Sequence, residues 1–211
     1  AYDVNLAAVK ILNRNGSGYT SWVIKGIEWC VAKNMDTINP SLSSETFSRA
    51  EEEANSCCLQ CWQVIVAPAG NDAHSGNNVQ YLLAYPTVLA VTATNKDNAI
   101  ATFSSCGTWV DIAAPGVYVH SGYLGSTYAI FSGTSMATPH VAGCAAALLA
   151  FDPALTMQRF MRSLHQRRPT LEAQAGTPYF GWGLVIHCNS ALRLEMLKIC
   201  PASLHKTQAD N

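Results

Sequence analysis

The chain has 211 residues, of which 49% are hydrophobic and 13% are charged, and its formal net charge is −1. This length and composition fit one globular domain with a large core and exclude a disordered chain. No basic stripe follows the sequence, which argues against nucleic acid or an anionic membrane surface as a partner. The longest apolar run, residues 141–151, is too short to cross a bilayer. Because the chain begins with Ala1 and not Met, we expect it to be part of a longer protein.

The first third of the chain alternates strand patterns with helix patterns. Residues 4–12 are almost continuously apolar, which predicts a strand buried on both faces of a sheet. Residues 20–33 carry apolar side chains at helical spacing, and the stretch TINPSL that follows predicts a short strand. Ser48 followed by Glu51 is the pattern of a capping box, which predicts the start of a helix that runs to about Cys61.

Three further strands and up to three helices are predicted in the rest of the chain. The stretches VIVAPAG, VLAVTAT and VDIAAPG each predict a buried strand that ends at a turn residue. A long helix is predicted from Ser135 to Phe151, a shorter one near 156–165, and a last one from about Asn189, after the glycine turns of PYFGWGLVIH. The alternation predicts an α/β fold with a mostly parallel sheet, as a single domain over 1–211.

Eight cysteines permit a disulfide framework without demonstrating one. Cys30 and Cys144 lie within helical apolar patterns, which favours small core side chains over bridges at both positions. Cys57, Cys58 and Cys61 form the cluster CCLQC, whose CxxC spacing suggests redox or zinc chemistry. The end of a helix disfavours a thiolate, however, and the sequence has no second pair at zinc spacing, which favours local disulfides or plain thiols.

Ser135 is the candidate nucleophile of the sequence. It follows a glycine at the predicted start of a helix, where free backbone N–H groups and the helix dipole suit a developing oxyanion. Asn71 follows the strand VIVAPAG, and its side-chain amide is a candidate second donor, because reactive groups collect at the carboxyl ends of parallel strands. Each residue also has a purely structural explanation, as a helix cap and as part of a turn. The nucleophile elbow G-x-S-x-G of α/β-hydrolases is not matched, because Ala137 occupies the last glycine position.

The segment GTSMATPHVAG at residues 133–143 resembles the nucleophile segment of subtilisin-like serine proteases. The resemblance continues through LAAVKIL, GSGYTSWVIKGIEWCVAKNMDTIN, APAGND, YLLAYP, FSSCG, VDIAAPG and GWGL, and so covers nearly the whole chain. It implies a subtilisin-like three-layer α/β fold and a serine endopeptidase that forms an acyl-enzyme on Ser135. In that scheme Asn71 and the backbone N–H of Ser135 stabilise the oxyanion.

The same resemblance implies where a peptide substrate binds. Ser41 and Leu42 match the edge segment that pairs with the substrate backbone. Residues 67–70, with Ala69 and Gly70 at their end, match one wall of the specificity pocket.

Three residues depart from the family pattern at this substrate site. Ser43 and Ser44 replace glycines that usually follow Ser-Leu, which crowds the expected peptide cleft. Pro68 replaces a small residue and removes a backbone donor.

The aspartate and histidine of a catalytic triad are not evident in this sequence. In the family they precede the region matched here, and the 211 residues contain no HGTH-like segment and no strand ending in Asp-[Ser/Thr]-Gly. His140 lies five residues after Ser135 on the same predicted helix, which turns it by about 140° and moves it by ~7.5 Å, out of hydrogen-bond reach. His74 fits a solvated loop position better than a catalytic one.

The sequence therefore predicts a partial subtilisin-like peptidase domain with its N-terminal strands missing. Its peptidase activity would require an N-terminal segment that supplies Asp and His. The alternative is a catalytically inactive fragment or pseudoprotease that binds extended peptides. Without the N-terminal strands, the predicted strand at 4–12 becomes an exposed edge, open to aggregation or to pairing with another chain.

The resemblance also bears on substrates, location and cofactors. It implies polypeptide substrates, and together with the cysteine count it favours an extracellular, secreted protein. The strong calcium site of the family depends on residues upstream of the matched region, so we expect no calcium, no other metal and no cofactor.

Overall fold

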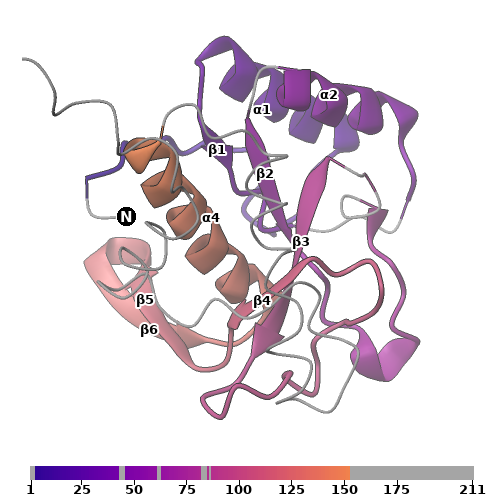
Figure 1. Ribbon diagram of the computed structural model, residues 1–211, viewed down its shortest axis with the longest axis vertical. Helices are drawn as coiled ribbons and strands as arrows, with labels where there is room; N and C mark the ends of the chain where they lie inside the picture. Colours follow the sequence, from indigo (N-terminus) through magenta and orange to yellow (C-terminus); the bar gives the residue numbers. More distant parts are fainter. Residues whose placement is uncertain (1–2, 43–45, 61–62, 82–84, 86, 153–211) are drawn as a thin grey trace, which may run out of the picture.

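The computed structural model describes residues 3–42, 46–60, 63–81, 85 and 87–152. Its main sheet is parallel, in the order β1-β2-β3-β4. The strands are β1 (Thr37–Ile38), β2 (Val64–Pro68), β3 (Val88–Thr94) and β4 (Ile112–Pro115). Helices α1 (Thr20–Ala32) and α2 (Arg49–Gln60) cover one face of the sheet, and α4 (Thr134–Phe151) covers the other (Figure 1). The predicted α/β fold with a parallel sheet is confirmed.

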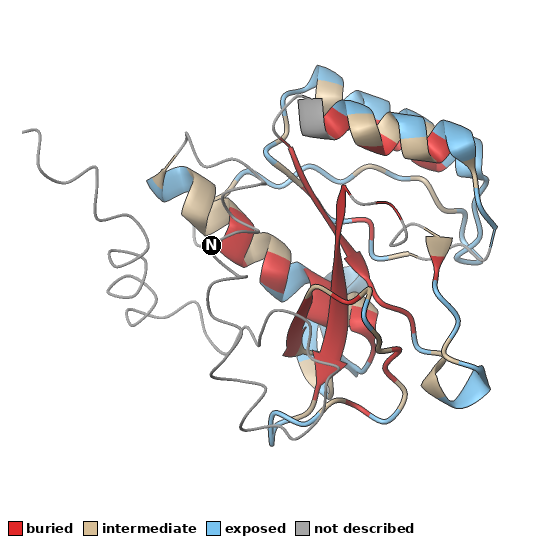
Figure 2. Ribbon diagram, turned by 45° about the vertical axis from the view of Figure 1, so that its right-hand side comes forward, coloured by how far each residue is buried: buried red, intermediate tan, exposed pale blue. Residues whose placement is uncertain are grey.

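The sheet is buried on both faces, which explains why its strands are apolar without alternation. In β2, Ile65 and Ala67 pack toward α1 and α2, whereas Val64 and Val66 pack toward α4. The strands are accordingly buried along their length (Figure 2). Burial on both sides leaves the strand ends as the places where polar side chains reach solvent.

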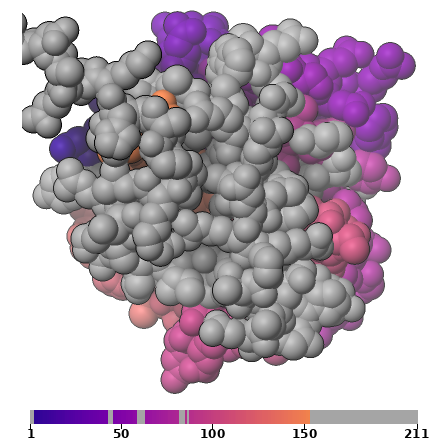
Figure 3. Space-filling model, in the orientation of Figure 1, coloured from indigo at the N-terminus to yellow at the C-terminus, as the bar shows by residue number. Residues whose placement is uncertain are grey.

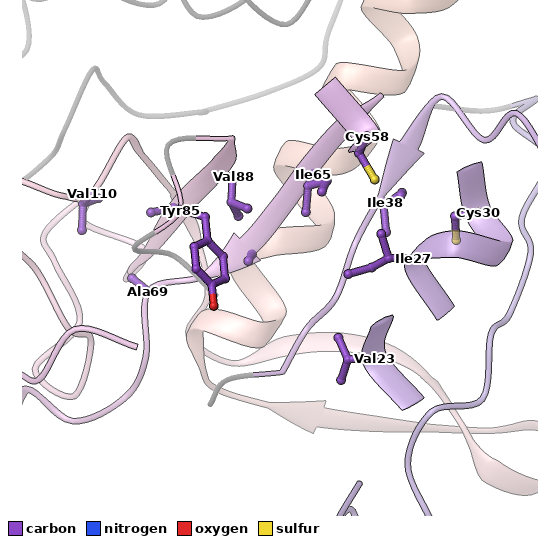
Figure 4. Close-up of a cluster of buried hydrophobic side chains, with 12 residues drawn as sticks. Val23, Ile27, Cys30, Ile38, Cys58, Ile65, Ala69, Tyr85, Val88 and Val110 are labelled. Atoms are coloured by element: carbon purple, nitrogen blue, oxygen red, sulfur yellow. The ribbon is translucent and has the colours of Figure 1, made fainter. Parts of the chain in front are cut away.

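Helix α1 forms over nearly the same residues that the sequence predicts. It contacts the sheet through one stripe of buried side chains. Val23, Ile27 and Cys30 are buried at helical spacing, and Ile27 lies next to Ile38 of β1 (Figure 4). The outer side of the α1–α2 layer reaches the surface (purple in Figure 3). Cys30 is a buried thiol without a disulfide, as the sequence predicted.

Helix α2 begins with half of the predicted capping box. The Ser48 hydroxyl accepts a hydrogen bond from the Glu51 N–H at 3.3 Å. The reciprocal bond from Glu51 is replaced by Tyr85, whose hydroxyl accepts from the Ser48 N–H at 3.3 Å and donates to the Ser48 carbonyl at 2.8 Å. Glu51 instead turns inward, where its side chain is 1% exposed and burial raises its pKa.

The strand predicted at residues 4–12 does not form, and that prediction is wrong. The segment has no regular secondary structure and joins no ladder, and Leu6 is 92% exposed. Val9 and Ile11 pack inward, against α1: a Cβ added at Gly26 would lie 2.9 Å from Ile11 Cγ2. An apolar strand needs a partner along its edge and cover on both faces, and the described residues supply cover on one side only.

A hairpin that the sequence analysis missed follows β4. Strands β5 (Val119–Tyr123) and β6 (Thr127–Phe131) pair antiparallel across the turn η2 (Leu124–Ser126), with Gly125 at φ 70°. This hairpin leads directly into α4, which follows β6 in the chain (Figure 1). Its strands are rich in aromatic and β-branched residues and are joined by three residues with a central glycine, a recognised hairpin pattern.

Helix α4 is long and apolar enough to cross a membrane by length and composition, with 18 residues at a mean hydropathy of 1.2. In this structure it packs on the sheet through Ala137, Val141 and Ala145. Cys144 on the same helix is disulfide-bonded, which corrects the prediction of a plain core thiol. A half-cystine is as apolar and buried as a thiol, so helical spacing does not distinguish the two. The elements predicted beyond Asp152 lie outside the described residues.

Candidate active site

The ends of β1 and β2 and the start of α4 meet at one edge of the sheet. Ser41 and Leu42 follow β1, Gly70 and Asn71 follow β2, and Ser135 is the second residue of α4. Contacts between these segments join residues far apart in the sequence. The structure therefore brings together the residues that the sequence singled out, although their roles stay predictions.

The start of α4 is fixed to the end of β4 through two glycines. The Gly133 N–H donates to the Gly116 carbonyl at 2.8 Å. A Cβ at Gly116 would lie 2.6 Å from Ala93 Cβ and 2.8 Å from the Gly133 carbonyl oxygen. Because no side chain fits at Gly116, the backbone before α4 lies directly on the sheet. This close approach sets the position of the helix N-terminus.

Thr134 holds the side chain of Asn71 in one orientation. Asn71 Oδ1 accepts from the Thr134 N–H at 2.9 Å and from the Thr134 hydroxyl at 3.1 Å. A backbone N–H can only donate, so the oxygen of the amide must face Thr134. The Thr134 hydroxyl also accepts from the Gly70 N–H at 3.3 Å. Asn71 Nδ2 is thereby turned away from Thr134 and is available as a donor.

Ser135 has a backbone N–H that is free within the described part of the chain. The N–H groups of Met136 and Ala137 are bonded to the Gly133 carbonyl, and that of Thr134 is bonded to Asn71. The first N–H groups of a helix have no intrahelical acceptor. Half-buried Ser135 thus combines a hydroxyl, a free N–H and the positive end of the α4 dipole.

The hydroxyl of Ser135 is bonded to the segment that follows β1. It donates to the Ser41 carbonyl at 3.4 Å, and the Ser41 hydroxyl shares its proton between the Ser135 carbonyl at 3.2 Å and Asn39 Oδ1 at 3.0 Å. The Ser135 carbonyl is open to this contact because its normal helical donor would be residue 139, and Pro139 has no N–H. By lacking an N–H, Pro139 therefore leaves the Ser135 carbonyl free to accept from Ser41.

Neither of the two histidines considered as catalytic bases makes a hydrogen bond to the Ser135 hydroxyl. His140 is exposed and its Nδ1 contacts the Met136 carbonyl at 3.0 Å. His74 is exposed in the short helix η1 (Ala73–Ser75). In the part of the chain that the structure describes, no histidine is bonded to Ser135.

The predicted substrate residues lie as follows. Ala69 is fully buried, and its N–H donates to the Val91 carbonyl at 2.7 Å. It is therefore packed inside the predicted pocket wall and is not exposed at the surface. Leu42 is half-buried against the core, and Ser41 is exposed. Pro68 ends β2 opposite Val91. Ser43 and Ser44 lie outside the described residues.

Sequence reasoning missed two residues of this region, Thr134 and Gly116, whereas the resemblance placed the floor of the specificity pocket near Gln80 and Tyr81. Gln80 is 4% exposed and donates from Nε2 to Asp72 Oδ2 at 2.8 Å, next to Asn71. Thr134 stood beside the candidate nucleophile, but its two bonds to Asn71 cross 63 residues and leave no local pattern.

Two of the three cysteines of the CCLQC cluster lie among the described residues. Cys57 is an exposed thiol and Cys58 is fully buried, whereas Cys61 lies outside the described residues. Among the described side chains, no three His, Cys, Asp or Glu are placed to hold a metal ion. Burial raises the pKa of the Cys106 thiol, which makes it a poor nucleophile at neutral pH.

A family model described as the subtilase family matches residues 1–183. The chain belongs to the subtilase family. This subtilase is 42% identical over 191 residues to Subtilisin E of Bacillus subtilis (strain 168), a match that covers 88% of this chain and 48% of the relative. It is 38% identical over 185 residues to the Minor extracellular protease Epr of the same organism, covering 88% of this chain and 28% of the relative.

Among solved structures, this subtilase is similar to a cold adapted subtilisin-like serine proteinase. The TM-score is 0.73 at 33% sequence identity, and the match covers 80% of this chain and 62% of that one. The subtilisin-like fold implied by the sequence is thereby confirmed. The chain spans about half the length of Subtilisin E, with 48% of that relative covered.

Proposed function

We propose that this chain carries the nucleophile and oxyanion donors of a serine endopeptidase. The observation that supports this most is the orientation of Asn71, whose oxygen is bonded to Thr134 so that Nδ2 is available beside the free N–H of Ser135. Membership in the subtilase family supports a peptidase acting on polypeptides.

In this mechanism the Ser135 oxygen attacks the carbonyl carbon of the scissile peptide bond, and its proton passes to a histidine base. The carbonyl oxygen becomes an oxyanion that accepts from Asn71 Nδ2 and from the Ser135 N–H. The proton then moves to the departing amine, the C–N bond breaks, and an acyl-enzyme remains on Ser135. Water hydrolyses this ester with the same base.

We propose that the histidine and its aspartate come from additional N-terminal sequence. The described histidines make no bond to Ser135, and the present 211 residues contain neither family motif. The Ser41 carbonyl now accepts the Ser135 proton at 3.4 Å, but a carbonyl cannot remove it.

A fluorophosphonate probe tests this proposal, because it labels only an activated serine. The 211-residue chain is expected not to label, and the chain extended by the in-frame sequence upstream of the Ala1 codon is expected to label rapidly. Ser135→Ala in the extended chain should abolish labelling. Labelling that survives Ser135→Ala, or an extended chain with both motifs that never labels, would contradict the proposal.

A second candidate function is peptide binding without hydrolysis. It is supported by the reciprocal contact of Ser41 and Ser135, which holds the serine in a hydrogen bond with the predicted substrate edge. Under this alternative, extended peptides bind to the chain while labelling stays absent with any upstream sequence.

We also propose an extracellular location. The name of the relative Epr includes the word extracellular, and the disulfide at Cys144 is typical of an oxidising compartment. Detection of the chain in culture medium, with the disulfide intact by mass spectrometry, tests this.

A further inference from the structure

The inner face of α2 carries polar side chains where a helix packed on a sheet ordinarily carries apolar ones. Glu51 and Asn55 lie one turn apart on this face, and they are 1% and 0% exposed. Glu51 Oε2 and both polar atoms of the Asn55 amide have no hydrogen-bond partner among the described residues. Buried polar groups are nearly always paired, and an unpaired one costs free energy of folding. The packing of α2 on the sheet is therefore weakened at these two positions.

The core beneath α2 offers Glu51 no positive charge. Ile65 and Ala67 of β2 and the Cys30 thiol of α1 belong to this core, in which Figure 4 shows Ile65 and Cys30. Among the described residues, no lysine, arginine or histidine is buried. Burial raises the pKa of Glu51, because an ionised carboxylate here loses its hydration without gaining a partner.

The titratable groups nearest to Glu51 supply no positive charge either. The pKa of Tyr85 is raised by burial first and then by three nearby groups, Glu51, Glu52 and Tyr81. Tyr85 is therefore a neutral phenol at physiological pH. Arg49, at the start of the same helix, is exposed and bonded to Glu53 at 3.2 Å on the solvent side. Ionisation of Glu51 would leave a buried carboxylate between a phenol and an apolar sheet.

The same end of α2 holds the segment that follows β1. Tyr85 is bonded to both the N–H and the carbonyl of Ser48, directly before the helix. Leu42 packs against the same core, and its neighbour Ser41 is bonded to Ser135. Loosening of the first turns of α2 would therefore reach the predicted substrate edge through a short stretch of chain.

We propose that Glu51 and Asn55 form a pH-sensitive switch under α2: the helix packs on the sheet while Glu51 is protonated, and its first turns loosen when Glu51 releases its proton to solvent. The switch needs no catalysis, and only its effect on peptide binding at Ser41 rests on the proposed function. Because the pKa of Glu51 is higher in the packed state, packing is strongest below the ordinary carboxyl value of ~4.3 and weakens as pH rises toward the raised one.

Hydrogen exchange of the 211-residue chain, followed by mass spectrometry from about pH 4 to pH 9, tests the switch. Rates are corrected for the intrinsic pH dependence of exchange, and the peptide covering α2 is compared with the peptide covering α4. Glu51→Gln and Glu51→Leu remove the buried acid in two ways, so that the test survives if one variant does not fold. Glu53→Gln is the matched control, because it removes a carboxylate from the exposed side of the same helix. Circular dichroism reports whether each variant is folded.

In the native chain and in Glu53→Gln, the protection of α2 should fall by ~10-fold per pH unit above ~4.3 and level off at the folded pKa, because opening is linked to release of one proton. The protection of α4 should stay constant, and the Glu51 variants should show no slope in α2. Asn55→Leu removes the unpaired amide, so it should raise the protection of α2 at every pH and keep the slope.

Three outcomes would overturn the proposal: a flat profile for α2 in the native chain, a slope that survives in a folded Glu51 variant, or an equal slope in α4, which would mean global unfolding. Lower protection in Asn55→Leu would remove Asn55 from the switch. Fluorophosphonate labelling has no part in this readout, so a failure of the proposed peptidase function leaves the result unchanged.

Discussion

Replacing Gly116 by alanine tests whether the close approach at the end of β4 sets the position of α4. The new Cβ would lie 2.6 Å from Ala93 Cβ and 2.8 Å from the Gly133 carbonyl oxygen. Carbon atoms in ordinary contact are ~3.5–4.0 Å apart, so the two backbones must separate by roughly 1 Å. Overpacking of this kind costs about 1–3 kcal/mol.

The matched control is Gly122→Ala in β5, where an added Cβ meets nothing within 4 Å. Both substitutions reduce the freedom of the unfolded chain by a similar amount, worth about 0.4–1 kcal/mol in favour of the folded state. The difference between the two variants therefore isolates the clash. For a chain of this size we expect Gly116→Ala to melt ~2–12 °C below Gly122→Ala.

Urea denaturation and thermal unfolding measure this difference, and fluorophosphonate labelling of the extended chain reports the displacement of Ser135. The labelling rate should fall in Gly116→Ala and stay unchanged in Gly122→Ala. Equal stability of the two variants would refute the reasoning, because it would mean that the strand end and the start of α4 are not in contact.

Three further outcomes are expected. Burial raises the pKa of Glu51, so its stabilising contribution is full below the unfolded pKa of ~4.3 and is lost as pH rises through the higher folded pKa. Glu51→Gln should flatten the stability-pH profile from urea denaturation in this range, and an unchanged slope would show that Glu51 is not the group responsible. Asn71→Asp keeps the acceptor for Thr134 but loses the Nδ2 donor, so labelling of the extended chain should slow by ~10²–10³-fold with little loss of stability. Asn71→Ala should slow labelling as well, and it should also destabilise the chain by about 1–3 kcal/mol because buried Thr134 loses its partner. Micromolar calcium should leave the melting temperature of the chain unchanged, and a rise of several degrees would contradict the expected lack of a tight calcium site.

The sequence predicts the strands and helices well where burial alone decides them. The runs that form β2, β3 and β4 are apolar because both faces of each strand are covered, and turn residues mark where they stop. The shared sheet edge of Asn71 and Ser135 also follows from the sequence, since parallel strands end on the same side. Their catalytic roles remain predictions.

Other features depend on partners that no local pattern reveals. Residues 4–12 have the composition of a buried strand, but a strand needs a neighbouring strand with which to pair. Among the described residues β1 is the edge of the sheet, and no further strand lies next to it. The reciprocal bond of the capping box was taken by Tyr85, 37 residues after Ser48. The role of Thr134 likewise rests on contacts with a distant residue, which appear only once the chain is folded.

Pro139 couples local opening of the first turn of α4 to local opening of the loop that follows β1. By leaving the Ser135 carbonyl without a helical donor, it allows Ser41, 94 residues earlier, to bond to the first turn of α4. The first turn of a helix ordinarily frays independently of the rest of a protein. Here fraying at Ser135 must also release the loop after β1, so native-state hydrogen exchange should report the candidate nucleophile and the substrate edge opening together.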